Sequence, residues 1–307
     1  MKKRLATAGL AAFVLADVAL VALALRAPEA APAAPSASAS SLTPVDVDAS
    51  TGAPTPESSA RAFYEPHPLT LMVVGVDERR AWRASTGSCA DGGAVVQTTS
   101  DGGTSWSKET SPSRAIARAQ PLSGSRGFAY GAGTDCTLRE YVTTDGGSTW
   151  RETQAVAGVW SRSVRDAHEV STPADSKSRP CGDQGVLDLL RTSSTGARVL
   201  CLDGALKRTS NAGGKWTDAG TVPGGLALSG RVERETFAVY AARVSDTCKG
   251  VEITRVTDAK PEVIACVETD AEAGPGEIDL STPAGAGWLV VGQETWTSAD
   301  LKSWKRA

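Results

Sequence analysis

An internal repeat constrains the fold of this chain more than any other feature of its sequence. Residues 99–106 read TSDGGTSW and residues 143–150 read TTDGGSTW, so the two segments match in spacing throughout, 44 residues apart. A weaker third copy occupies residues 209–216 (TSNAGGKW), and a shortened copy occupies residues 298–304 (SADLKSW). A period of about 40 to 50 residues is typical of arrays of small supersecondary units.

Each copy of the repeat has the composition of a turn between two β-strands. Its Asp or Asn can accept hydrogen bonds from backbone amides of its own turn, and its glycines allow positive φ. A short run of β-type composition precedes each turn, and the Trp begins the returning strand. We therefore interpret the repeat as a folding signal. Its defining positions are Asp101, Gly103, Trp106, Asp145, Gly147, Trp150, Asn211, Gly213, Trp216, Asp300 and Trp304.

The pattern Ser/Thr-x-Asp-x-Gly-x-Ser/Thr-Trp resembles the Asp-box, or BNR repeat, of β-propellers, which include sialidases and photosystem-assembly-factor-like propellers. The resemblance implies an all-β propeller of four-stranded blades over residues 61–307. A fifth turn would fall at Asp258, where Gly and Trp are missing, and we expect five blades. The interval from Asp145 to Asn211 is 66 residues long, and we assign its excess to an insertion around residues 160–180. Six blades is the alternative, if that interval hides a blade without its turn.

The N-terminal segment, residues 1–26, has the pattern of a membrane signal. A basic tip (MKKR) precedes a run at residues 5–25 that is apolar except for Thr7, Gly9 and Asp17. The run is long enough to span a bilayer as a helix, and the positive-inside rule then places the C-terminal domain outside the cytoplasm. We expect an uncleaved single-pass anchor in the cell membrane. The alternative is a signal peptide cleaved after residues 22–24, which would give a secreted protein.

A spacer follows the apolar run. Residues 27–60 consist mostly of Ala, Ser, Pro and Thr and contain no Lys or Arg. Such a segment cannot bury enough apolar surface to fold, so we predict an extended linker between the membrane and the propeller.

All six cysteines follow the apolar run, which is the arrangement of an exported domain with disulfides. Cys89 and Cys136 precede the Asp of their turns by 12 and 9 residues, so they occupy comparable places in neighbouring blades. The other four form two pairs, each within one expected blade. We predict sequential pairing: Cys89–Cys136, Cys181–Cys201 and Cys248–Cys266. The chain has only two His and no CxxC-like spacing, so we expect no metal site and no cofactor.

We do not expect catalysis, and we assign no catalytic residue. In sialidases an Arg-Ile-Pro segment supplies the first Arg of the substrate clamp, and no such tripeptide occurs in this chain. Tyr240, with Arg243 and Glu235, is the nearest grouping to a tyrosine nucleophile with its clamp and base. We interpret Tyr240 as a packed strand residue. The net charge of −3 makes nucleic acid a poor candidate partner.

We place the candidate partner-binding site in the insertion, because a long loop within a compact domain is usually functional or mobile. We expect residues 162–178 to be removable without loss of the fold. The sequence thus indicates a non-catalytic extracytoplasmic propeller that serves as a binding or scaffold module for another envelope component, protein or glycan. The alternative is a sialidase-like glycoside hydrolase or a carbohydrate-binding propeller. The candidate partner-binding residues are Trp160, Arg162, Arg165, His168 and Arg179.

Overall fold

The computed structural model describes residues 71–257 and 261–307. The expected membrane helix, the linker and the turn expected at Asp258 lie outside these ranges. Within them, no helix is long and apolar enough to cross a membrane.

The described chain forms five antiparallel sheets of four strands each and one pair of short strands. The first sheet contains β1 (Leu71–Gly75), β2 (Ala81–Ser85), β3 (Val95–Thr99) and β4 (Ser107–Glu109). The second contains β5 (Ala115–Pro121), β6 (Gly127–Ala132), β7 (Leu138–Thr143) and β8 (Arg151–Ala155). The third contains β11 (Val186–Arg191), β12 (Ala197–Cys201), β13 (Ala205–Thr209) and β14 (Thr217–Thr221). The fourth contains β15 (Gly225–Glu233), β16 (Thr236–Ser245), β17 (Cys248–Val256) and β18 (Glu262–Glu268). The fifth contains β19 (Ile278–Ser281), β20 (Gly287–Val291), β21 (Glu294–Ser298) and β22 (Lys305–Arg306).

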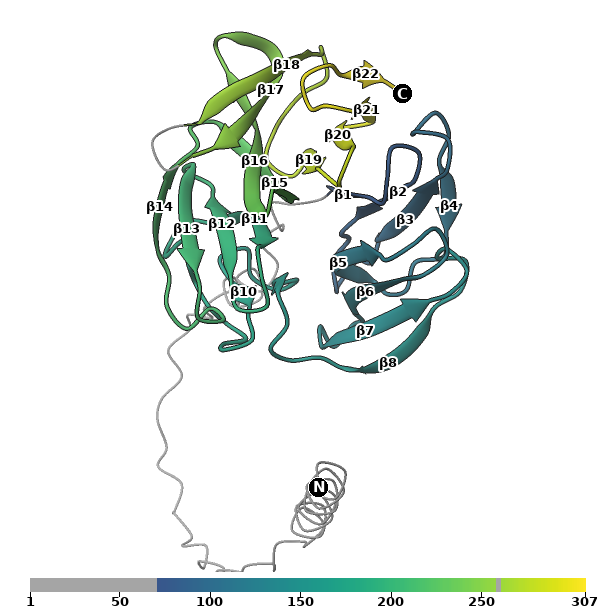
Figure 1. Ribbon diagram of the computed structural model, residues 1–307. Helices are drawn as coiled ribbons and strands as arrows, with labels where there is room; N and C mark the ends of the chain where they lie inside the picture. Colours follow the sequence, from purple (N-terminus) through teal and green to yellow (C-terminus); the bar gives the residue numbers. More distant parts are fainter. Residues whose placement is uncertain (1–70, 258–260) are drawn as a thin grey trace, which may run out of the picture. The chain divides into compact units, whose positions relative to one another are not determined.

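The sheets are the blades of a five-bladed β-propeller (Figure 1). Each blade consists of four consecutive strands paired in chain order. The first strands of the blades are innermost: β1 contacts β5 and β19, and β15 contacts β11 and β19. The structure therefore confirms five blades and excludes the six-bladed alternative within the described residues.

Strand direction gives the propeller two distinct faces. Neighbouring strands alternate in direction, so the turn after the first strand and the repeat turn after the third strand of a blade lie on the same face. Accordingly, the Gly102 amide donates to the Arg79 carbonyl, and the Gly146 amide donates to the Ser125 carbonyl. We call this side the Asp-box face. The turn between the second and third strands lies on the other side, which we call the disulfide face.

The two short strands β9 (Ser161–Arg162) and β10 (Val170–Ser171) belong to the long interval in the repeat. Strand β9 contacts β5 of the second blade and β11 of the third. The insertion is therefore a wedge between these two blades, with two strands where a further blade would need four.

The repeat turns have the chemistry that their sequence predicts. Asp101 Oδ1 accepts hydrogen bonds from the Ser105 amide at 3.0 Å and from the Thr99 hydroxyl at 2.8 Å, and Oδ2 accepts one from the Ser105 hydroxyl at 2.6 Å. Gly103 has φ +90°, which favours glycine. The second copy repeats this pattern around Asp145.

The Trp of each well-matched turn packs across a blade boundary, which the repeat alone does not show. Trp150 of the second blade lies edge to face with Trp82 of the first, with 5.7 Å between ring centroids. Trp106 of the first blade lies 6.3 Å from Trp288 of the fifth. Edge-to-face pairs of this kind stabilise aromatic cores, so the repeat joins blades as well as turning strands.

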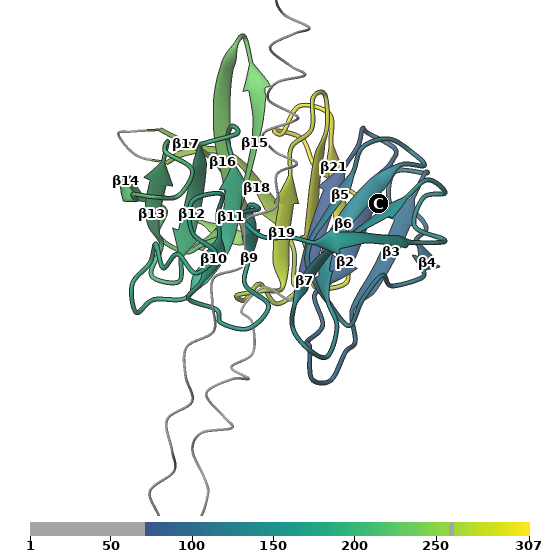
Figure 2. The same cartoon turned by 90° about the horizontal axis from the view of Figure 1, so that it is seen from below.

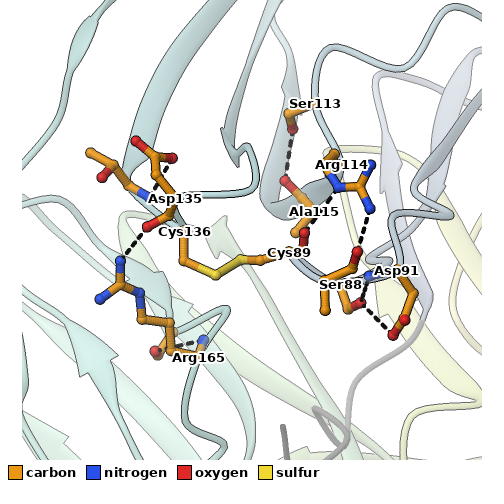
Figure 3. Close-up of a disulfide and its surroundings, with 12 residues drawn as sticks. Ser88, Cys89, Asp91, Ser113, Arg114, Ala115, Asp135, Cys136 and Arg165 are labelled. Atoms are coloured by element: carbon orange, nitrogen blue, oxygen red, sulfur yellow. Dashed lines mark hydrogen bonds between the residues drawn. A yellow bond between two sulfur atoms is a disulfide. The ribbon is translucent and has the colours of Figure 1, made fainter. Parts of the chain in front are cut away.

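Three disulfides are present, and they are the pairs expected from the sequence: Cys89–Cys136, Cys181–Cys201 and Cys248–Cys266. The first joins two blades, and each of the others closes one blade region. Figure 3 shows the Cys89–Cys136 bridge between Arg114, which donates to the Cys89 carbonyl at 2.9 Å, and Arg165, which donates to the Asp135 carbonyl at 2.6 Å.

Candidate functional site

The principal candidate site is a cavity of about 360 Å³ on the axis of the propeller. First strands from all five blades line it, together with residues 160–162 of the wedge. Several of the lining residues have small side chains, among them Ala117, Ser229 and Ser281. The lining includes the last residues of several first strands, so the cavity lies toward the Asp-box face.

Two aspartates of the cavity, the partly buried Asp188 and the buried Asp279, connect neighbouring blades. Asp188 Oδ2 on β11 accepts a hydrogen bond from the Leu228 amide on β15, at 2.6 Å. Asp279 Oδ2 on β19 accepts one from the Val73 amide on β1, also at 2.6 Å. Burial raises the pKa of both carboxyl groups, that of Asp279 well above its usual range.

Arg162 shares the interior with these aspartates. Its side chain is buried and donates to the Leu187 carbonyl at 2.7 Å. Burial lowers the pKa of Arg162 to about 9, while Asp188 and Asp279 oppose that effect. No group of three or more His, Cys, Asp or Glu side chains among the described residues could hold a metal ion.

The mouth of the cavity is basic. Arg118 on β5 donates to Gln120 Oε1 at 3.0 Å and to the Trp160 carbonyl at 3.3 Å. Arg191, at the end of β11, also lines the cavity and donates to the Ser193 carbonyl at 3.0 Å. The two guanidinium groups and the Tyr130 hydroxyl lie within electrostatic reach of one another. No ion pair joins either guanidinium to a carboxylate in the described part of the chain.

The hairpin of β15 and β16 stands beside this mouth. These strands have 9 and 10 residues, longer than any strand of the other four blades, and Figure 2 shows the hairpin projecting beyond its neighbours. Phe237 and Gly230 from the hairpin line the cavity. The Phe237 ring covers Gly230 so closely that a Cβ there would lie 2.5 Å from it.

Tyr240 is a buried strand residue of this hairpin, as its place in the alternating run predicts. Its hydroxyl donates to Glu233 Oε1 at 2.6 Å and does not pair with Glu235. Arg243 instead pairs with Glu252 at 2.6 Å. Burial and the Glu233 carboxylate raise the pKa of Tyr240, which makes the phenol a poorer nucleophile.

The residues predicted for partner binding divide into two groups. Trp160 and Arg162 are each 5% exposed and hold the wedge in place. The Trp160 indole donates to the Ser194 carbonyl at 3.1 Å, and its ring lies edge to face with that of Trp216. Arg165, His168 and Arg179 lie toward the disulfide face. His168 Nδ1 is 2.8 Å from Asp166 Oδ1, and Arg179 is 3.3 Å from Asp166 Oδ2.

The expectation that residues 162–178 are dispensable does not agree with this packing. Val170 and Thr172 are fully buried, and the Thr172 side chain fills the space beside Gly213 of the third repeat turn. Removing the segment would open the joint between the second and third blades.

Sequence reasoning missed the residues that form the cavity. Asp188 and Asp279 interrupt apolar first strands, and a charge within such a run is the one local sign of a buried role. Arg118, Arg191 and Phe237 belong to three different blades, and no local pattern connects them.

Comparisons with known proteins give only distant likenesses. No protein-family model matches the chain, and no curated protein sequence matches it. Among solved structures, YCF48 bound to a D1 peptide has 17% identity and a TM-score of 0.29, over 78% of this chain and 67% of that chain. The GH74 enzyme of Niastella koreensis has 12% identity and a TM-score of 0.43, over 77% of this chain and 46% of that chain.

An exo-1,5-alpha-L-arabinanase from a bovine ruminal metagenomic library has 11% identity and a TM-score of 0.37, over 78% of this chain and 92% of that chain. None of these likenesses is close enough to assign a ligand to this chain.

Proposed function

We propose that this protein is a non-catalytic, extracytoplasmic binding propeller, held at the cell membrane by its N-terminal segment, that recognises another component of the cell envelope. The observation that carries the proposal is that the carboxyl groups of the cavity are occupied by hydrogen bonds from backbone amides. Both oxygens of Asp279 accept backbone amides, from Val73 and Leu280, and both oxygens of Asp188 accept those of Leu228 and Leu189. A general acid or base must instead exchange its proton with a substrate.

The three disulfides support the extracytoplasmic part of the proposal. Disulfides persist in oxidising compartments and are rare in the cytosol, so a chain with all of its cysteines bridged fits an exported domain.

The disulfide face is the proposed contact surface for the partner. There the wedge presents Arg165, His168 and Arg179 around Asp166, while its buried half, including Trp160, fixes their position. A loop held by a rigid scaffold is the usual carrier of recognition in such folds.

Cross-linking of the full-length protein in its own membrane, followed by affinity purification and mass spectrometry, tests this function. We expect one partner in near-stoichiometric yield, and we expect Arg179→Ala to lower its recovery. Arg151→Ala, at an exposed position on the edge strand β8, is the matched control and should recover the partner as the wild type does. Recovery of abundant background proteins alone would contradict the proposal.

The second candidate function is glycoside hydrolysis, and one observation favours it. Two carboxyl groups with raised pKa values, those of Asp188 and Asp279, occupy one cavity with Arg162. A raised carboxyl pKa is the property of a general acid at neutral pH. A fluorogenic sialoside assay decides between the two: turnover that disappears in Asp279→Asn would establish the hydrolase, and we expect no turnover.

A further inference from the structure

The mouth of the cavity has two parts. Exposed apolar side chains of the β15–β16 hairpin lie on one side, and the guanidinium groups of Arg118 and Arg191 lie in the cavity beside them. On the hairpin, Val232 pairs directly with Phe237, so both side chains lie on the same face of the two strands. Val232 is 67% exposed and Phe237 37% exposed, and Phe237 lines the cavity. Exposed apolar side chains beside a cavity that also presents charged and polar groups are typical of ligand sites.

The mouth carries the guanidinium groups of Arg118 and Arg191, while the carboxyl groups of Asp188 and Asp279 in the same cavity have raised pKa values and accept backbone amides. Arg118 and Arg191 line the same cavity as Phe237, and neither forms an ion pair with a carboxylate in the described ranges. Arg118 is half-buried and its guanidinium bonds only neutral groups, the Trp160 carbonyl and Gln120 Oε1. A guanidinium in such surroundings gains strongly from an anionic ligand, because charge-assisted hydrogen bonds are the stronger ones.

The hairpin is held in place from its other side. Glu233 accepts hydrogen bonds from the Tyr240 hydroxyl at 2.6 Å and from Arg231 Nε at 2.8 Å, and Arg255 lies 3.4 Å from its second oxygen. At the tip, Arg234 and Glu235 have φ +45° and +71°, the left-handed conformation that both central residues of a two-residue type I′ hairpin turn adopt.

We propose that this mouth binds a small amphiphilic acid, whose carboxylate is held by Arg118 and Arg191 and whose apolar body packs on Phe237 and Val232. The cavity volume of about 360 Å³ is in the range of small-molecule sites. The site lies toward the Asp-box face, so it goes beyond the envelope partner proposed for the disulfide face. Loss of one would leave the other intact.

The probe is 4-phenylbutyrate, titrated by calorimetry into the full chain in lipid nanodiscs, with empty nanodiscs as the blank. We expect saturable one-site binding. 4-Phenylbutan-1-ol has the same apolar body without the charge, and inorganic sulfate has charge without the apolar body. Each should bind at least about tenfold more weakly, because the alcohol lacks the charge-assisted hydrogen bonds to the two guanidinium groups and sulfate lacks the apolar contact with Phe237 and Val232.

Two variants locate the site. Arg191→Gln and Phe237→Ser should each weaken 4-phenylbutyrate binding about tenfold or more. Their matched controls are Arg208→Gln, an exposed arginine on β13, and Val263→Ser, a 52% exposed valine on β18, and both should bind as the wild type does. An unchanged thermal transition in each variant shows that the fold is intact.

Three results would overturn the proposal: equal affinity for the acid and the alcohol, unsaturable uptake, or wild-type affinity in both Arg191→Gln and Phe237→Ser. The cross-linking experiment on the partner is unaffected by any of them, because it reports on the other face.

Discussion

The amide of Val73 donates a 2.6 Å hydrogen bond to Asp279 Oδ2 across 206 residues of sequence. This bond joins the first strand of the first blade to the first strand of the last blade, and the Gly75 amide adds a second bond to the Ser281 hydroxyl at 3.0 Å. Each blade in the described ranges is made of consecutive strands, so no described strand is exchanged between the first and last blades to close the ring. Closure in the described chain depends instead on these bonds and on the packing of Trp288 against Trp106.

Asp279→Ala should lower the free energy of unfolding, because it leaves the buried amides of Val73 and Leu280 without acceptors, at about 1 to 3 kcal/mol for each buried group. Burial raises the pKa of Asp279 well above 3.8, so the carboxyl group favours folding most when it is protonated. The difference from the wild type should therefore be largest near pH 4 and narrow toward pH 8. Urea unfolding at both pH values measures it. Asp270→Ala, at an exposed aspartate, should lack this pattern.

Asp145 should show the opposite pH dependence. Hydrogen bonds from the Thr149 hydroxyl and amide lower its pKa to about 2, against 3.8 without them. Its contribution is therefore complete above pH 3.8 and is lost as the pH falls toward 2. Asp145→Ala should lower the melting temperature at pH 6, and the gap from the wild type should close near pH 2.

Asp145→Asn should be milder, because Asn211 accepts equivalent bonds from Thr209 and Lys215 in the third turn. A melting-temperature gap for Asp145→Ala that stays constant from pH 6 to pH 2 would show that the carboxylate is not the stabilising group.

The disulfides should differ in their contribution to stability. Cys89–Cys136 closes 47 residues and Cys248–Cys266 closes 18, which corresponds to about 4 and about 3 kcal/mol in the loop-entropy model. Replacing both cysteines of the first pair by Ser should therefore destabilise more than replacing both of the second. Denaturant unfolding of the two double variants measures both losses of unfolding free energy. A larger loss on removing Cys248–Cys266 would contradict the ranking by loop length.

Two tryptophans of the repeat should respond differently to substitution by Phe. The Trp150 indole donates to the Thr110 carbonyl at 2.8 Å, whereas the buried Trp106 Nε1 has no hydrogen-bond partner among the described residues. Trp150→Phe should therefore destabilise by about 1 kcal/mol more than Trp106→Phe, the usual net value of one hydrogen bond. Chemical denaturation of the pair measures this difference, and equal losses would refute it.

The fold was far more predictable than the site. The spacing of Thr99, Asp101 and Ser105 forms a turn through bonds within a few residues, so the sequence displays it directly. The sequence shows the wedge only as extra length between two repeat turns. It favours Trp160 and Arg162 as surface residues for partner binding, whereas the structure buries both. Burial of these two side chains depends on β5 and β11, which lie far from them in the sequence.

By itself, the sequence indicated the all-β class, the disulfide pairs and five blades with six as the alternative, because a local repeat encodes strand, turn and strand within one unit. Only the tertiary structure decided how the ring closes and what its axis contains. Asp279 meets Val73, and Phe237 shares a cavity with Arg118 and Arg191, because five separately encoded blades converge. Contacts between blades depend on the angle at which the blades pack against one another, and no short stretch of sequence determines that angle.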